Sequence, residues 1–218
     1  MSFTDSVCPL CRGTDVHQYH EDSTRRYLQC PHCFLVFVPP QYHLPVDEEK
    51  AVYDLHQNKS DQDGYRRFLS RLATPLLQKL GAEKNRGLDF GCGPGPVLAR
   101  MLEEHGHTVD LYDPIYFNKT DLLTQTYDFV CATEVVEHFR NPAGGFNKLF
   151  SLVDSGWLAI MTKRVRNSEA FRNWHYIRDP THICFYSKET FVYLASLYNV
   201  SIEFQGDDIV FLGKNIGG

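Results

Sequence analysis

The chain has 218 residues, of which 43% are hydrophobic and 22% charged, and its formal net charge is −5. This composition argues against wholesale disorder and fits one domain, or one domain with a small module. The longest apolar run spans about five residues, 34–38, whereas a membrane helix needs ~20. The first residues lack a secretory signal, and the acidic balance argues against broad nucleic-acid binding. We expect a soluble, cytoplasmic protein with no membrane partner.

Cysteines dominate the first segment of the chain. Four of the seven fall in the first 33 residues as two CPxC pairs. Two residues between thiolates let a tight turn bring both sulfurs onto one ion, and two such turns supply four ligands. The spacing favours structural zinc over a pair of disulfides, because four protein ligands leave no open coordination position. We predict a zinc ribbon at residues 1–40, with the ligands Cys8, Cys11, Cys30 and Cys33.

The rest of the chain predicts alternating helices and strands. Residues 41–64 are polar and indicate a linker with a short helix near 51–56, and a helical pattern then runs from Tyr65 to about Leu80. Strands are expected at 88–90, 108–112, 127–132 and 157–162, helices at 97–105, 146–153 and 187–198, and a closing hairpin at 200–212. This alternation predicts an α/β domain at 65–218, with helices on both faces of a mostly parallel sheet.

A glycine-rich loop follows the first strand of this domain. In LDFGCGPG, residues 88–95, a strand leads into three alternating glycines and then a helix. Such a loop places a ligand at the carboxyl end of the strand, where glycines let it lie against bare backbone. Pro96 replaces the last glycine of a pyrophosphate fingerprint, which disfavours a dinucleotide. Asp113 ends the next strand, where a carboxylate can accept hydrogen bonds from both ribose hydroxyls of a nucleoside.

Three successive segments, LDFGCGPG, VDLYDP and YDFVCATEVVEHFRNP, resemble the motifs of class I S-adenosylmethionine-dependent methyltransferases. The resemblance covers roughly residues 65–212 and implies a Rossmann-like sheet of seven strands, mostly parallel, with an antiparallel last strand. Only the 13 residues 114–126 separate Asp113 from Tyr127, too few for the family's usual helix and full third strand. The resemblance implies S-adenosylmethionine as cofactor, with contacts from Asp89, Gly91, Gly93, Gly95, Asp113, Thr133 and Glu134.

Candidate acceptor-side residues cluster in two places, Glu137-His138 after the fourth strand and residues 173–182 after the fifth. A histidine titrates near neutrality and suits general-base work. We expect His182 or His138 to serve as the base and Tyr176 to orient the acceptor. The alternative for His182 is a backbone hydrogen bond that only fixes its loop.

Three functions remain open at this stage. The first is a methyltransferase that transfers a methyl group by in-line displacement to a small molecule, such as a sugar or secondary metabolite. The second is an rRNA or tRNA methyltransferase whose ribbon grips RNA, although basic residues are sparse there. The third is a non-catalytic adaptor with a degenerate methyltransferase fold. The oligomeric state is not predicted.

Overall fold

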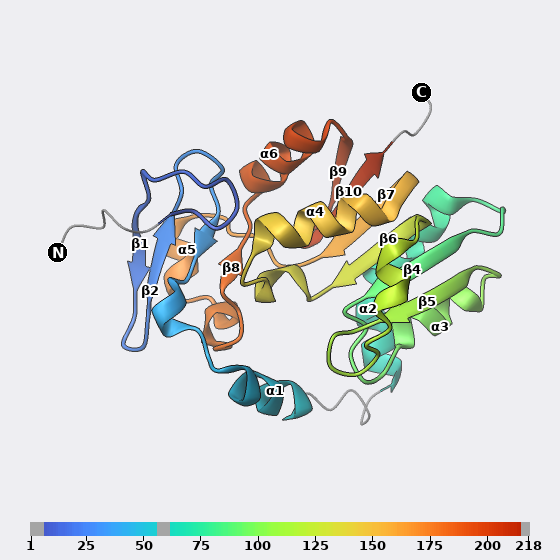
Figure 1. Cartoon of the computed structure of the whole chain (residues 1–218), viewed down its shortest axis with the longest axis horizontal. Coiled ribbons are helices and arrows are strands. Elements are labelled where there is room, and N and C mark those ends of the chain that lie inside the picture. The colour runs from blue at the N-terminus through green and yellow to red at the C-terminus, as the bar shows by residue number, and fades with distance from the viewer. Residues whose placement is uncertain (1–6, 56–61, 215–218) are drawn as a thin grey trace.

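A computed structural model describes residues 7–55 and 62–214. Within these ranges the chain forms two sheets, and in Figure 1 the smaller sheet lies at the left of the molecule, whereas the larger sheet occupies its centre and right. No helix in the described residues is long and apolar enough to span a membrane.

The larger sheet has the strand order β5-β4-β6-β7-β10-β9. Strands β4, β5, β6 and β7 pair in parallel, whereas β10 is antiparallel to both β7 and β9. This confirms the mostly parallel α/β sheet with its antiparallel closing hairpin. The strands are β4 (Arg86–Phe90), β5 (Thr108–Tyr112), β6 (Tyr127–Thr133), β7 (Val153–Met161), β9 (Ser201–Gln205) and β10 (Ile209–Lys214).

The described part of this sheet has six strands, not the seven that the family resemblance implied. The difference lies between β5 and β6. There residues 113–126 form one β-bridge, Asp113 to Phe117, and a single 3-10 turn, η2 (Thr120–Thr124). A crossover of this length is too short for a helix and another parallel strand.

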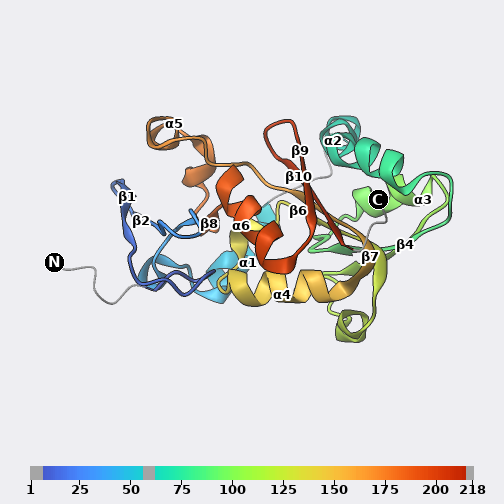
Figure 2. The ribbon, with the colours of Figure 1, turned by 90° about the horizontal axis from the view of Figure 1, so that it is seen from above.

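Helices cover both faces of the sheet, and Figure 2 shows α2 and α4 on opposite sides. The alternation of side chains along β6 explains this, because Phe129 and Cys131 pack with α2 and α3, whereas Val130 and Ala132 pack with α4 and α6. Helix α2 begins three residues before the predicted Tyr65. The helices are α2 (Gln62–Leu80), α3 (Val97–Glu103), α4 (Pro142–Leu152), α5 (Ser168–Arg172) and α6 (Lys188–Tyr198).

The predicted linker carries α1 (Val46–Leu55), a longer and earlier helix than the sequence pattern indicated. Residues 56–61 of that linker lie outside the described ranges. The acidic Glu49 of α1 accepts a hydrogen bond from Arg140 at 2.7 Å, and Tyr116 Oη donates to Asp54 at 2.7 Å. These contacts attach α1 to the segments that follow β6 and β5, so the helix is part of the α/β body.

The sheet of the N-terminal module includes a strand from the segment between α5 and α6. Strands β1 (His17–Glu21), β2 (Arg26–Gln29) and β3 (Val36–Phe37) form antiparallel pairs, and β8 (Cys184–Phe185) pairs with β3. Leu28 and Phe37 lie in the same hydrophobic cluster as Val136 and Phe191 of the larger domain. We propose a division of the chain into a zinc ribbon at 1–40, a linker at 41–64 and a methyltransferase domain at 65–218. The ribbon and the domain share one hydrophobic core.

Candidate active site

The glycine loop joins β4 to α3 in a backbone conformation that favours glycine. Gly91 and Gly93 have φ of 75° and 62°, in the left-handed region. A Cβ on Gly91 would lie 2.5 Å from Val135 Cγ2, whereas a Cβ on Gly93 would meet no atom within 4 Å. The amide N–H groups of Gly91 and Cys92 both donate to the Tyr112 carbonyl of β5, at 2.7 and 3.3 Å. The loop therefore lies against the end of β5 and leaves open space over Gly93.

Asp113 holds the glycine loop against the turn that follows β5. Its Oδ2 accepts from the Gly93 amide at 3.0 Å, and its Oδ1 accepts from the amides of Ile115 and Tyr116 at 2.8 and 3.0 Å. An ionised carboxylate offers about four acceptor positions. Three are occupied by backbone, so about one position on Oδ2 remains for a ligand.

The loop and Asp113 open into a cavity of about 910 Å³ at the carboxyl edge of the parallel strands. Its other walls come from α1, from the segment after β6 and from the segment after β7. Of the ten predicted catalytic and cofactor-binding residues, eight line it, and these are Gly91, Gly93, Asp113, Thr133, Glu134, His138, Tyr176 and His182.

The remaining two, Asp89 and Gly95, do not line the cavity. Asp89 is 4% exposed, and burial, followed by the charge of Asp113, raises its pKa to about 7. The backbone amide of Ala99 in α3 acts in the opposite direction on that pKa. Asp89 therefore lies beneath the loop, against the first turns of α3.

A buried pair of acids lies at the far side of the cavity, where Glu134 lines it and Glu137 is fully buried behind it. The hydroxyl of Tyr176 donates to Glu137 Oε1, lies 3.2 Å from Glu134 Oε2 and also contacts Thr162 Oγ1 at 3.2 Å. One hydroxyl proton cannot serve two ionised carboxylates, and Glu134 Oε1 and Glu137 Oε2 are buried with no hydrogen-bond partner. Burial, followed by the charge of Glu134, raises the pKa of Glu137 to about 8. The pair therefore holds a proton near neutral pH.

Both predicted histidines are oriented by backbone carbonyls. His182 Nδ1 lies 2.8 Å from the Tyr176 carbonyl and His138 Nδ1 lies 3.1 Å from the Thr181 carbonyl. A carbonyl only accepts, so each ring carries a proton on Nδ1. Burial, with the nearby His138 next in effect, lowers the pKa of His182 to about 4. The ring is therefore neutral at physiological pH, but it is a weaker base than the near-neutral histidine that the sequence led us to expect. The backbone hydrogen bond that was the alternative role for His182 is therefore present, and it involves Nδ1. A general base would accept its proton on the other ring nitrogen, Nε2.

Helix α1 supplies cavity residues that sequence reasoning missed. Val46, Glu49 and Tyr53 line the cavity, and Tyr53 Oη donates to Glu49 at 2.7 Å. The signal was the four-residue spacing of an acid and an aromatic residue on one helix face. Lys163, after β7, also lines the cavity and was not predicted.

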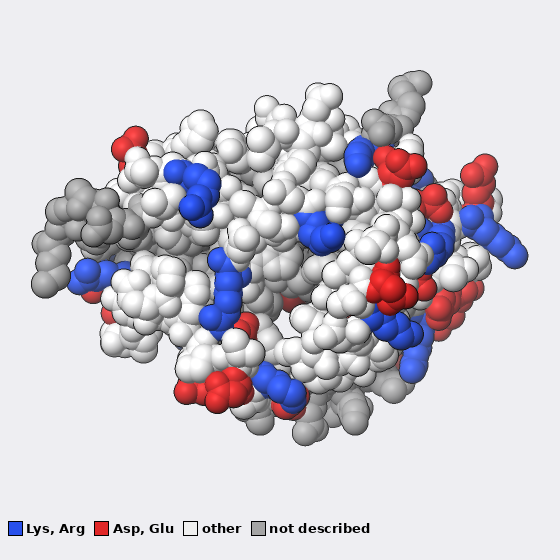
Figure 3. All heavy atoms as spheres, in the orientation of Figure 1, with Lys and Arg blue, Asp and Glu red and all other residues white. Residues whose placement is uncertain are grey.

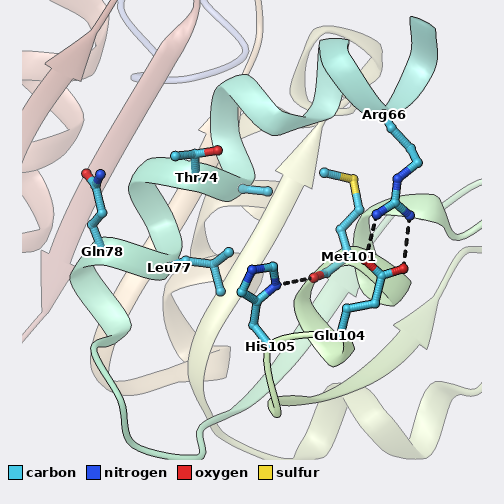
Figure 4. A pocket seen from close by; sticks show the side chains of 8 residues that line it. Arg66, Thr74, Leu77, Gln78, Met101, Glu104 and His105 are labelled. Carbon is cyan, nitrogen blue, oxygen red and sulfur yellow. Dashed lines mark hydrogen bonds and ion pairs between the residues drawn. The ribbon is translucent and has the colours of Figure 1, made fainter. Parts of the chain in front are cut away.

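A smaller hollow of about 380 Å³ lies between α2 and α3 (Figure 4). Arg66 and Glu104 form a two-pronged ion pair across it, and His105 Nδ1 is bonded to the Met101 carbonyl. None of the predicted site residues lines this hollow. The larger cavity is therefore the candidate active site.

The four N-terminal cysteines come together as the spacing predicted. Their sulfurs lie within 4.8 Å of one another, and the pairs Cys8–Cys33 and Cys11–Cys30 are each 3.4 Å apart. These separations are far longer than a disulfide bond of ~2.05 Å. They are close to the ~3.8 Å expected between thiolates on a tetrahedral zinc with Zn–S bonds of ~2.3 Å. The four residues fit a zinc ion.

A sequence model described as a methyltransferase domain matches residues 62–202. The chain belongs to this methyltransferase family. The match includes the glycine loop, Asp113 and the segment after β6, and it confirms the S-adenosylmethionine-dependent methyltransferase expected from the three motifs. A search of curated proteins finds no match.

Solved methyltransferase structures share the fold of this methyltransferase. The 1,6-didemethyltoxoflavin-N1-methyltransferase of Burkholderia thailandensis, with bound 1,6-didemethyltoxoflavin and S-adenosylhomocysteine, is 14% identical with a TM-score of 0.51, covering 90% of this chain and 97% of that one. The magnesium protoporphyrin IX methyltransferase of Synechocystis PCC 6803, with bound S-adenosylhomocysteine, is 17% identical with a TM-score of 0.52, covering 77% and 93%. At such identities the likeness concerns the fold alone.

The first prediction concerns the cysteine module. We expect about one zinc per chain, and Cys30→Ser to lose it, because three thiolates hold zinc less tightly than four. Atomic absorption on the purified protein measures the metal. Cys92→Ser, which alters a cavity-lining cysteine, should retain the zinc. Full zinc content in Cys30→Ser would contradict the four-thiolate site.

A second prediction follows from the acid pair. Because the pKa of Glu137 is raised from its ordinary 4.5 to about 8, the folded state binds its proton more tightly than the unfolded state. The free energy of unfolding should therefore fall as pH rises from about 5 to about 8. Glu137→Gln should flatten this fall in urea titrations, whereas Glu189→Gln, on an exposed position, should not. An unchanged slope in Glu137→Gln would show that the proton is not held there.

Proposed function

We propose that this methyltransferase transfers the methyl group of S-adenosylmethionine to a small-molecule acceptor, such as a sugar or secondary metabolite. The observation that carries the proposal is the single cavity of about 910 Å³ that has the bare glycine loop and Asp113 on one wall and Tyr176 and His182 on another. A cavity of this volume has room for a nucleoside cofactor beside a small acceptor.

The cofactor half is the wall built from β4 and β5. We assign one ribose hydroxyl to the remaining acceptor position of Asp113 Oδ2, and the amino-acid end to the open backbone over Gly93, with Thr133 and Glu134 nearby. Asp89 and Gly95 act through the shape of the loop, since they do not line the cavity. A nucleoside with an amino-acid tail fits this wall better than a dinucleotide, because the loop lacks the last fingerprint glycine.

The acceptor half is the wall that carries Tyr176 and the two histidines. The bound cofactor supplies a methyl group already activated by its sulfonium. The residues of the chain then hold the acceptor atom in line with it and exclude water, which is mainly a proximity effect. Tyr176 orients the acceptor, and the neutral His182, with His138 beside it, accepts the proton that a hydroxyl or amine loses.

The other two functions have less support. Basic and acidic side chains are interspersed over the described surface shown in Figure 3, which displays no continuous basic tract for RNA. An adaptor has no need for a cavity whose glycine loop is tied to Asp113. Calorimetric titration with S-adenosylmethionine, followed by S-adenosylhomocysteine release from a panel of nucleotide-linked sugars and phenols, tests the proposal directly.

The cofactor wall yields a third prediction. Asp113→Ala removes both the ribose acceptor and the hydrogen bond to the Gly93 amide, so S-adenosylmethionine affinity should fall at least about tenfold. Isothermal calorimetry measures the change. Asp110→Ala, three residues earlier and paired with Arg86 outside the cavity, is the matched control. Equal affinities in the two variants would refute the ribose role.

A fourth prediction concerns the acceptor wall. His182→Ala should retain cofactor affinity but slow S-adenosylhomocysteine formation by about 10²–10⁴-fold, the usual contribution of a general base. His105→Ala, in the separate hollow of Figure 4, should leave both quantities unchanged. If His182→Ala turns over at the wild-type rate, the residue serves only to fix its loop.

A further inference from the structure

Arg25 of the cysteine module reaches the acceptor wall. Its side chain is buried, with 6% of the residue exposed. The guanidinium donates to three backbone carbonyls of one short loop, those of Ile177 at 2.7 Å, Asp179 at 2.8 Å and Pro180 at 3.1 Å. A buried charge is costly unless it is matched, so these carbonyls and the guanidinium depend on each other.

The arginine is itself held within the module. Its Nε donates to Tyr27 Oη at 2.9 Å, and that hydroxyl lies 2.8 Å from Asp22 Oδ2. Asp22 also accepts from the amides of Thr24 and Arg25, at 2.7 and 2.9 Å. The turn between β1 and β2 therefore holds the guanidinium in one orientation. These two strands belong to the N-terminal sheet, and the two cysteine pairs lie directly before β1 and between β2 and β3.

Backbone pairing continues the connection. The Val38 amide donates to the Ile183 carbonyl at 2.9 Å, and β3 pairs with β8 directly after the loop. The loop, residues 175–183, carries Tyr176, Asp179 and His182, all of which line the cavity. The module thus contacts this loop in its middle, through Arg25, and at its carboxyl end, through Val38 and β3.

The cofactor wall has different supports. The amides of the glycine loop bond to Tyr112 and Asp113 of the β5 end. In Figure 1 the β4 and β5 strands lie at the end of the molecule away from β1 and β2. A structural change in the cysteine module is therefore expected to alter the acceptor wall before it alters the cofactor wall.

We propose that the cysteine module is a brace for the acceptor-side loop, with Arg25 as the positioning residue, so that zinc loading governs acceptor capture and leaves cofactor binding unchanged. The acceptor assignment rests on the proposed function. The coupling between Arg25 and the loop does not.

The test compares Arg25→Met with Arg25→Lys in the full-length, zinc-loaded protein. Hydrogen exchange followed by mass spectrometry reports on the loop amides of Thr181 and His182, which bond to Asp179. We expect Arg25→Met to speed their exchange at least about tenfold and Arg25→Lys to restore part of the protection, because an ammonium can bond some of the three carbonyls. The amides of Gly91 and Cys92 should exchange as in the wild type.

Arg26→Met is the matched control. Arg26 neighbours Arg25 in sequence, but its side chain is 37% exposed and pairs with Glu21 at 2.8 Å. It should leave loop exchange unchanged. Zinc content must match the wild type in all three variants, and removal of zinc with a chelator should reproduce the loop exposure of Arg25→Met.

Two further measurements decide the proposal. Calorimetry with S-adenosylmethionine should give the wild-type affinity in Arg25→Met, and turnover with an active acceptor from the panel should show a higher KM for that acceptor alone. Unchanged loop exchange in Arg25→Met overturns the brace, as does a parallel loss of cofactor affinity. Wild-type protein that does not bind S-adenosylmethionine would refute the proposed function while leaving the exchange result interpretable.

Discussion

The carboxylate of Asp113 holds two strand ends together, and the cavity depends on that contact. One of its oxygens bonds to the Gly93 amide, and the other bonds to the turn after β5. Without these bonds the left-handed glycines would have many alternative conformations, because glycine pays a large entropic cost when it is ordered. The same carboxylate faces the cavity, so one group both shapes the cofactor wall and offers an acceptor to a ligand.

On the opposite wall, the Tyr176 hydroxyl lies between two acids that share a proton. Glu134 and Glu137 are both held close to the Tyr176 hydroxyl, in a region where burial penalises the charged form of each acid. Glu134 also has a φ of 52°, in the left-handed region that non-glycine residues seldom adopt. Strained backbone and perturbed acids cluster at functional sites. Their coincidence here, beside the imidazoles of His138 and His182, marks the wall where chemistry is expected.

Features that depend on neighbouring residues in the sequence were predictable. The zinc spacing, the glycine loop and Asp113 each follow from local geometry, since a turn or a strand end brings adjacent residues together. The sequence did not show that α1 lines the cavity, that β8 completes the N-terminal sheet or that Arg25 contacts residues 177–180. These contacts join segments that are far apart in the sequence, so even where a local spacing marks a helix face, as in α1, it does not tell what that face contacts. Asp89 shows a further limit, because a motif position does not tell whether a side chain contacts the ligand or the fold beneath it.

The pairing of β3 with β8 has a consequence for biosynthesis. Residues 36–37 bond to residues 184–185, which are about 150 positions later in the chain. A nascent polypeptide emerges with its amino end first. The cysteines can bind a metal early, but their sheet lacks its fourth strand until residues 184–185 have been translated. During that interval the edge of β3 is open to association with other chains.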